Sequence, residues 1–504
     1  MLEVTFEFKI MGADSKYHRI LANYFTSKPL FLSKNDDVRP NIRKLQELPW
    51  QLNNSKNWKQ LFSELKYLSF LKLLAFYYIY DLHEYWGNLE RKSKFHISIA
   101  YKSIIVDPAV DIHAAHDVDN LLGHHGYIEE AIDLREKLVD YYISNNDNHN
   151  LARTYGNLGL AYEYVCEPEK ALSYFEQSIQ LAEQIGDINT LISGLQNKSQ
   201  LLITLRKLKL AISYNEHALR ISRQLGNLRS EAGILLNQGI AFYLQGKLDD
   251  ATKNVLHSQF LFKNLQDFDG YQKATGELGI FEMQCNPSKA MAHFKEQEAI
   301  CRKYNITKSL SSCLENQGAL EMIQGNPNKA RDLYQKQAEI SHKTGDFEGV
   351  FKANFNTAFI YFKNGYFENS RIIIERAIVL GRDLKVKTPF EKALVIQGHL
   401  LAFHGMIDDA LVLYNEAIQK GKLYLLAEEM SVLCCMVGDF LLPFYMGYKD
   451  NNLISKEWVD YKTPSYIDKI NDFLQISIHF YQQAIDIHPS NVHAIKMMEL
   501  AYKL

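Results

Sequence analysis

The stretch NLGLAYEYVCEPEKALSYFEQSIQLAEQIGD, residues 157–187, contains two amphipathic segments joined by a short turn. Gly159 lies in the first segment, and Ala171 follows it by twelve residues in the second. Phe175, a large side chain, comes four residues after that alanine. Two antiparallel helices approach closely only where side chains are small, and a large neighbouring side chain then fills the remaining space. The stretch therefore predicts a helical hairpin.

This arrangement recurs with a period of 40 residues, and only one step is a residue shorter. The residues that open the second helices are Ala131, Ala171, Ala211, Ala251, Ala290, Ala330, Ser370 and Ala410. The small residues of the first helices are Gly159, Ser199, Gly239, Gly279, Gly318, Ala358 and Gly398. The large residues four positions after the alanines include Arg135, Phe175, Phe294, Tyr334, Tyr414 and, in the last hairpin, Tyr481, and we expect them to fill the grooves between hairpins.

A single hairpin leaves an apolar face exposed, and stacking the next hairpin against it covers that face. The pattern therefore predicts an all-α fold, an α-α superhelix of about nine hairpins preceded by a helical arm. The residue ranges predict four parts: an arm over 1–110, eight repeats over 111–430, an insertion or distorted repeat over 431–465, and a final repeat with a capping helix over 466–504.

Residues 157–187 resemble a tetratricopeptide repeat of the long-helix type found in kinesin light chain and mitotic-spindle adaptors. The standard period of that repeat is about 34 residues, so 40 indicates longer helices. The segment FYQQAIDIHPSN, residues 480–491, has the spacing of a closing unit. The resemblance implies a protein interaction module whose first helices line a concave binding face.

A second resemblance concerns the N-terminal arm, residues 17–90. Its segments YHRILANYF, RKLQELPWQL, NWKQLFSEL and YDLHEYW are similar to the arm that precedes the repeats in nephrocystin-like signalling NTPases of the STAND class. In that family the repeats sense a ligand and release an NTPase domain. The sequence contains no GxxxxGK[ST] phosphate loop. The alternatives are a free-standing binding module or the sensor part of a split or truncated NTPase, whose partner would be an NTPase subunit.

Composition narrows the function further. Apolar residues make up 47%, charged residues 23%, and the formal net charge is −3. This balance gives no global attraction to nucleic acid or to anionic membranes, so we expect neither as a partner. The six cysteines contain no CxxC pair and no signal peptide is visible, which favours a cytoplasmic protein with reduced thiols.

The candidate binding residues occupy one position of the repeat, two residues before each small residue. Asparagine stands there at Asn157, Asn197, Asn237, Asn316 and Asn356, and Glu277 takes the remaining position. An amide both donates and accepts hydrogen bonds, so such a row can hold the main chain of an extended peptide. The alternative is that the asparagines cap or bridge helices of the scaffold.

One turn earlier lie Arg153, Lys273 and Lys352, which we expect to attract an acidic segment or a carboxyl terminus. The alternative is ordinary solvated charge. In DIHAAHDVDNLLGHHG, residues 111–126, His113 and His116 have a spacing compatible with a shared metal, but no further ligand spacing completes a set. We therefore predict no metal and no cofactor. Without GxSxG or HExxH motifs we predict no enzyme, and a hydrolase based on these histidines is the remaining rival.

Overall fold

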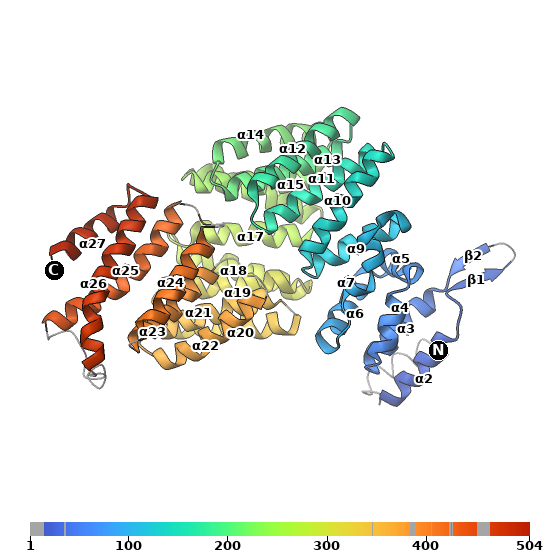
Figure 1. The fold of residues 1–504 in the computed structure, drawn as a ribbon. Coiled ribbons are helices and arrows are strands. Elements are labelled where there is room, and N and C mark those ends of the chain that lie inside the picture. Colours follow the sequence, from blue (N-terminus) through green and yellow to red (C-terminus); the bar gives the residue numbers. More distant parts are fainter. Residues whose placement is uncertain are drawn as a thin grey trace. The chain divides into compact units, whose positions relative to one another are not determined.

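The computed structural model describes residues 15–34, 37–344, 346–383, 389–404, 406–422, 425, 427–450 and 464–503. This part of the chain is almost entirely helical, which confirms the predicted all-α fold (Figure 1). The chain forms two compact units. Unit 1 comprises Met1–Leu202 with Glu216–Ala218, and unit 2 comprises Ile203–Asn215 with Leu219–Leu504.

The N-terminal segment of unit 1 consists of short helices and one β-hairpin. Its elements are α2 (Ser15–Thr26), β1 (Phe31–Lys34), β2 (Asp37–Pro40), α3 (Ile42–Asn54), α4 (Trp58–Leu65), α5 (Leu68–Tyr77), α6 (Ile79–Lys92), α7 (Ile97–Ala100), α8 (Lys102–Val106) and the 3₁₀ turn Pro108–Val110. The antiparallel strands, which pair Phe31 with Pro40, depart from the helical arm expected from the sequence. Pro29 precedes this hairpin and Pro40 ends its second strand, and proline disfavours the interior of a helix.

The repeat region begins with four hairpin helices and α13 of unit 1. Their bounds are α9 (Ile112–His124), α10 (Ile128–Ser144), α11 (Asn148–Tyr164), α12 (Pro168–Ile185) and α13 (Ile188–Thr204). The helices that follow are α14 (Leu208–Gln224), α15 (Leu228–Leu244), α16 (Leu248–Asn264), α17 (Phe268–Glu282), α18 (Pro287–Lys303), α19 (Thr307–Ile323), α20 (Pro327–Thr344), α21 (Phe347–Lys363), α22 (Phe367–Asp383), α23 (Phe390–Phe403), α24 (Ile407–Gly421), α25 (Ala427–Asp450), α26 (Pro464–Ile487) and α27 (Val492–Lys503).

Glycine and a large side chain meet inside several hairpins. A β-carbon built at Gly279 of α17 would lie 2.5 Å from Cε1 of Phe294 on α18. The same overlap would occur between Gly159 and Phe175 and between several later pairs. The large residues therefore pack on the glycine of their own hairpin, because the missing β-carbon leaves the space for the ring. Phe294 and Tyr334 also share core clusters with Cys313 and Ile360 of the next hairpins, as expected for residues that fill the grooves between hairpins.

Capping residues follow the same period. Asp147, Asn227 and Asp267 each accept a hydrogen bond from the backbone N–H three residues later and so begin α11, α15 and α17. Pro168 and Pro287 occupy the first turn of α12 and α18, where a missing N–H costs little. The polar residues between hairpins thus start the next helix as well as ending the previous one.

The N-terminal segment and the first repeats share one hydrophobic core. This core extends from Ala22 to Leu151 and includes the fully buried Trp86. The Tyr101 hydroxyl donates to the backbone oxygen of Leu65 at 2.6 Å inside it. The segment is consequently an integral part of unit 1.

The last helices of unit 2 also form a pair. A β-carbon at Gly438 of α25 would lie 2.6 Å from Tyr481 of α26, and the Ser431 hydroxyl donates to Ala484 O at 2.7 Å. The range 431–465, for which the sequence predicts an insertion or a distorted repeat, contains most of α25 and residues 451–463, which lie outside the described residues. The predicted division at residue 431 stays a prediction.

Candidate functional site

The asparagine row is the set of positions two residues before the small residue of each first helix: Asn157 and Asn197 in unit 1, and Asn237, Glu277, Asn316 and Asn356 in unit 2. On α17, Gly279 points toward α18. Two residues correspond to a rotation of about 200° around a helix, so Glu277 points away from α18. In unit 2 the first helices α15, α17, α19 and α21 pack successively against one another. The row therefore lies on a layer made of first helices.

The asparagine side chains of the row are not used by the scaffold. In the described ranges, no hydrogen bond joins the side-chain amides of Asn157, Asn197, Asn237, Asn316 or Asn356 to another protein group. Asn157 is exposed and the other four are partly exposed. The alternative that these residues cap or bridge helices consequently has no support in their contacts.

The three predicted cations differ in their surroundings. Lys273 pairs with Asp269 at 2.6 Å, and Lys352 pairs with Glu348 at 2.8 Å, each one turn earlier on the same helix. Arg153 is exposed and has no ion-pair partner among the residues that the structure describes. Two of the three positive charges are therefore locally compensated, and Arg153 is the one that remains available.

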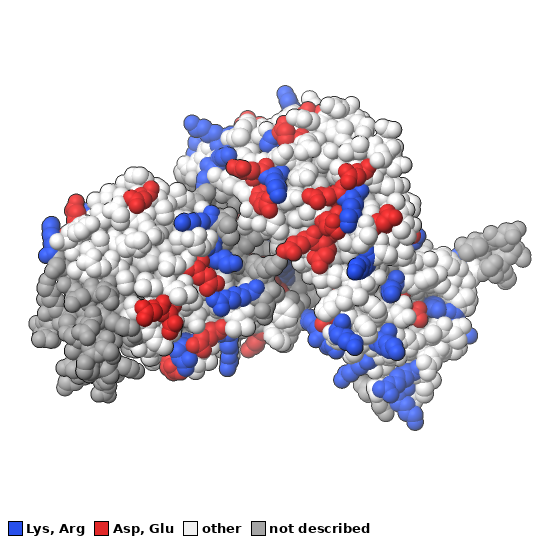
Figure 2. Space-filling model, in the orientation of Figure 1, with Lys and Arg blue, Asp and Glu red and all other residues white. Residues whose placement is uncertain are grey.

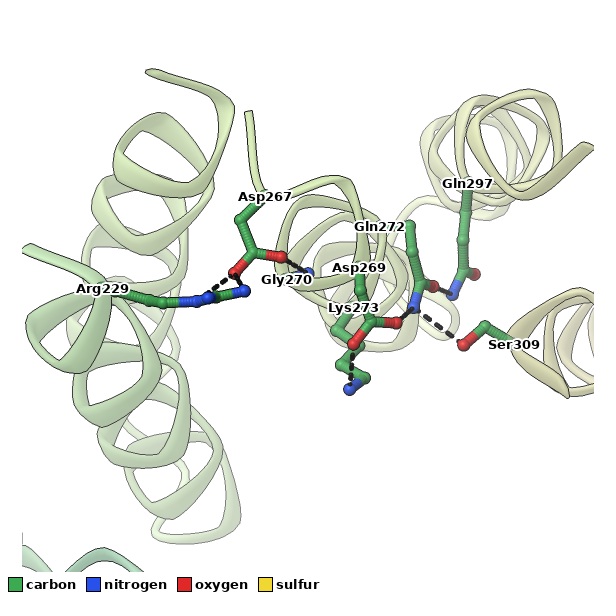
Figure 3. Close-up of polar contacts among 8 residues, drawn as sticks. All are labelled: Arg229, Asp267, Asp269, Gly270, Gln272, Lys273, Gln297 and Ser309. Atoms are coloured by element: carbon green, nitrogen blue, oxygen red, sulfur yellow. Dashed lines mark hydrogen bonds and ion pairs between the residues drawn. The ribbon is translucent and has the colours of Figure 1, made fainter. Parts of the chain in front are cut away.

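A network of polar contacts surrounds Lys273 in unit 2. Figure 3 shows Lys273 directed to Asp269, while Gln272 turns toward the neighbouring helices. The buried Gln272 accepts a hydrogen bond from Gln297 of α18 at 2.8 Å and lies 2.8 Å from the hydroxyl of Ser309 on α19. These contacts tie α17 to its neighbours through side chains next to the row.

The same figure shows a contact toward α15. Arg229 of that helix forms an ion pair at 2.7 Å with Asp267, which also accepts the N–H of Gly270 at the start of α17 (Figure 3). The Asp267 carboxylate therefore caps α17 and also binds Arg229 of α15. Such contacts fix the spacing of the first helices.

Unit 1 contains a hollow of about 1120 Å³ between α9, α10 and α11. Its lining brings together Arg153 and Asn157, which the sequence predicts as binding residues, with His113 and His116. Asp117 and Tyr142 line it as well. The structure thus unites two predicted groups of residues that lie far apart in the sequence.

Several groups in the hollow are already engaged. Arg135 donates to Asp119 at 2.6 Å and to the backbone oxygen of Asn157 at 2.9 Å. The Tyr142 hydroxyl lies 2.6 Å from Nε2 of His116. Burial, together with Arg153 nearby, lowers the pKa of His116, so its imidazole is neutral at neutral pH. The groups in the described lining without a hydrogen bond or ion pair include the guanidinium of Arg153, the amide of Asn157, the carboxyl of Asp117 and the imidazole of His113.

Asp117 is a row position that sequence reasoning missed. It stands 40 residues before Asn157 and two residues before Asp119, which replaces the usual small residue. Within the part of the chain that the structure describes it has no hydrogen bond or ion pair. Burial raises its pKa to about 6, against the opposing attraction of Lys72. The 40-residue period alone, applied without requiring glycine, could have found it.

The histidine cluster has no metal-like geometry. Searched over the described residues, the chain has no group of three His, Cys, Asp or Glu side chains arranged to hold a metal. Nδ1 of His125 lies 3.2 Å from Oε2 of Glu90, and the ring of His83 packs at a tilt against that of His124. Burial and these neighbouring histidines lower the pKa of His83 to about 4. The cluster is a set of packed rings.

Surface charge varies along the chain. Figure 2 shows basic side chains gathered over the N-terminal helices, whereas both signs alternate on the repeats of this face. Among the described helices, none combines the length and apolar character needed to cross a membrane.

Comparison with known proteins agrees with this geometry. Residues 122–184 match the family model described as tetratricopeptide repeat. The chain contains tetratricopeptide repeats. A search of the curated proteins gives no match.

Solved structures with tetratricopeptide-like folds share only low sequence identity. A Rap protein complexed with competence and sporulation factor is 12% identical, with a TM-score of 0.43 over 73% of this chain and 99% of that one. The quorum sensor NprR from B. thuringiensis is 11% identical, with a TM-score of 0.36 over 65% and 93%. A STAND signal-transduction ATPase with a tetratricopeptide-repeat sensor from Pyrococcus horikoshii is 13% identical, with a TM-score of 0.36 over 83% of this chain and 54% of that one.

Proposed function

We propose that the chain is a non-catalytic scaffold that binds an extended peptide, or an extended segment of a partner protein, along the part of the asparagine row that lies in unit 2. The observation that carries this proposal is that five amides stand at the same position of successive tetratricopeptide repeats without a partner in the described ranges. A partly exposed amide without a protein partner keeps its donor and its acceptor free for a ligand. A ligand main chain would supply the missing partners.

The spacing suits an extended chain. Packed helices lie about 8–10 Å apart, so the four row positions of unit 2 span about 24–30 Å. An extended residue advances about 3.3 Å, so a segment of eight to ten residues covers this distance. Amides contact backbone groups without regard to side chains, and specificity must then come from other residues.

The test uses a display library of random ten-residue peptides selected on the full chain. The affinity of the selected peptides is then measured by fluorescence anisotropy for a triple variant, Asn237→Ala, Asn316→Ala and Asn356→Ala. Three lost hydrogen bonds of about 0.5–1.5 kcal/mol each predict at least a tenfold loss of affinity. Alanine is a better helix former than asparagine, so the variant should remain folded.

The matched control replaces three exposed asparagines of the second helices α16, α22 and α24, Asn264→Ala, Asn369→Ala and Asn415→Ala. It should bind as the natural chain does. Equal binding by both triple variants, or failure to select any peptide, would contradict the proposal.

A second candidate is the sensor part of a STAND-type NTPase, with an NTPase subunit as partner. It is favoured by the resemblance of residues 17–90 and by the core that this segment shares with the first repeats. The test is whether a gene next to this one encodes a GxxxxGK[ST] phosphate loop and whether its product co-purifies with the chain. Absence of co-purification with such a product would remove this candidate.

A further inference from the structure

Glu277 is the acidic member of the asparagine row in unit 2. It lies on α17 between α15 and α19, whose corresponding residues are Asn237 and Asn316. Its carboxyl has no hydrogen bond and no ion pair within the described parts of the chain. A carboxylate therefore stands in a row of neutral amides without compensation from the scaffold.

Lys273, the nearest cation along α17, does not pair with the carboxyl of Glu277. Lys273 precedes Glu277 by one turn but is held by Asp269, one turn earlier still (Figure 3). An acidic residue four positions before a lysine is the favoured orientation on a helix, and the reverse order is weaker. The pairing seen in unit 2 is consequently the one that helix electrostatics prefers.

The helices packed against α17 also leave Glu277 uncompensated. Burial raises the pKa of Glu277 to about 7, and no charged neighbour contributes to this shift. Several charged groups on or beside α15, α18 and α19 have other partners: Arg229 with Asp267, Glu231 with Arg223, Glu296 with Tyr271, Glu298 with Arg302, and Glu315 with Gln337. Lys295 of α18 and Lys308 of α19 are exposed. On α16, Asp249, Asp250, Lys253 and Lys263 are exposed. A cationic group supplied by a ligand would stabilise the carboxylate.

We propose that Glu277 is a specificity-determining residue of the asparagine row and binds one cationic nitrogen group of the peptide, from a lysine or arginine side chain or a free amino terminus. This inference rests on the proposed peptide binding. The amides hold the main chain without regard to sequence, and Glu277 selects a charge at one place along it. A charge-assisted hydrogen bond is about twice as strong as a neutral one, so a single carboxylate can dominate the preference.

The rival account is that Glu277 stays protonated and acts as one more neutral donor and acceptor, like an amide. The two accounts differ in pH dependence. If the carboxylate binds a cation, the ligand favours the ionised form, and affinity rises as the pH increases from 6 to 8. If the protonated acid binds, affinity falls over the same interval.

The experiment uses the strongest peptide selected on the full chain. Its lysines are replaced one at a time by norleucine, its arginines by citrulline, and its amino terminus is acetylated, which separates the two sources of the cation. Dissociation constants are measured by fluorescence anisotropy for the natural chain, Glu277→Gln and Glu277→Asn, with Lys273→Gln as the matched control. We expect one neutralised group to weaken binding to the natural chain by about tenfold to a hundredfold.

Both Glu277 variants should bind the cationic and the neutralised peptide alike and lose the pH dependence, and Lys273→Gln should behave as the natural chain. An unchanged preference of Glu277→Gln for the cation would overturn the inference. So would an affinity of the natural chain that falls as the pH rises. In either case the asparagine triple variant would still lose binding, which separates failure of this inference from failure of the proposed function.

Discussion

The first two hairpins of the repeat region, α9–α10 and α11–α12, solve the same packing problem with different chemistry. In the second hairpin, glycine at 159 lets the helices approach and Phe175 fills the space beside it. Forty residues earlier, the same two positions hold Asp119 and Arg135, which form an ion pair at 2.6 Å with both side chains largely buried. The comparison teaches that the repeat fixes positions and distances rather than residue types.

The largest expected effect comes from breaking that ion pair. Replacement Arg135→Met leaves the buried carboxylate of Asp119 without a partner, and such losses cost about 3–5 kcal/mol of unfolding free energy. The measurement is urea unfolding followed by tryptophan fluorescence in a Trp458→Phe background. The remaining tryptophans, Trp50, Trp58 and Trp86, belong to or pack against the core shared with this hairpin.

The control is the double variant Asp119→Gly with Arg135→Phe, which places the glycine and phenylalanine of the second hairpin at the same positions of the first. Replacing a buried ion pair by apolar packing is often neutral or stabilising. A single Arg135→Met variant that loses less than about 1 kcal/mol would mean that the pair is solvated and that the two hairpins are not equivalent.

The next effect concerns the glycine of the second hairpin. Gly159→Ala places a β-carbon against the ring of Phe175, and this overpacking should cost about 1–3 kcal/mol. Gly87 of α6 is the matched control, because a β-carbon there would approach only Arg91 and His125, at 3.8 and 3.9 Å. Gly87→Ala should stabilise unit 1 by about 0.5–1 kcal/mol through helix propensity. Equal signs for the two substitutions in the same urea assay would refute the packing account.

The row position of the two hairpins gives a smaller, pH-dependent difference. Asp117 has a folded-state pKa of about 6, above its usual value of 3.8, whereas Asn157 does not titrate. As the pH rises, Asp117 ionises in the unfolded chain before it ionises in the folded chain. The stability cost of Asp117 therefore develops between about pH 4 and 6 and persists at higher pH. Asp117→Asn should therefore gain about 1–2 kcal/mol relative to the natural chain at pH 8 and almost nothing at pH 3.5. A gain that is the same at both pH values would contradict this cause.

The smallest effect lies at the helix ends. Asn146 follows α10 with a φ of 53°, and Gly186, forty residues later, follows α12 with a φ of 72°. Glycine adopts this left-handed conformation without strain, while asparagine tolerates it at some cost. Asn146→Gly should add up to about 1 kcal/mol and Gly186→Ala should remove about 1–2 kcal/mol, as thermal unfolding measures. A loss of stability in Asn146→Gly as well as in Gly186→Ala would contradict the account, because it would mean that the ends of α10 and α12 are not equivalent.

The sequence predicts the hairpins because their glycines and aromatic rings repeat at a constant interval. It also predicts Arg153 and Asn157 as neighbours on one face, and the hollow of unit 1 contains both. Asp117 was not predicted as a row position, because the repeat pattern requires a small residue two positions later, where Asp119 stands. The pairing of Lys273 with Asp269 was also not foreseen, because a choice between two nearby carboxyls depends on helix orientation rather than on spacing alone.

The N-terminal β-hairpin could not be predicted from periodicity, because two strands of four residues are too short for a repeating pattern. The same holds for the shared core of that segment and the first repeats. Its members, from Ala22 to Leu151, come from elements without a common period. Tertiary packing, rather than local pattern, determines this part of the chain.

The central claim is that the asparagine row contacts a peptide, and photo-crosslinking tests it most directly. Benzoylphenylalanine is placed at Ser312, exposed on α19 one turn before Asn316, or at Asn369, exposed on the second helix α22. Each protein is irradiated with a biotinylated peptide selected on the natural chain. The account predicts crosslinks from position 312 and none above background from position 369. Crosslinks from position 369 alone, or equal yields from both positions, would contradict it.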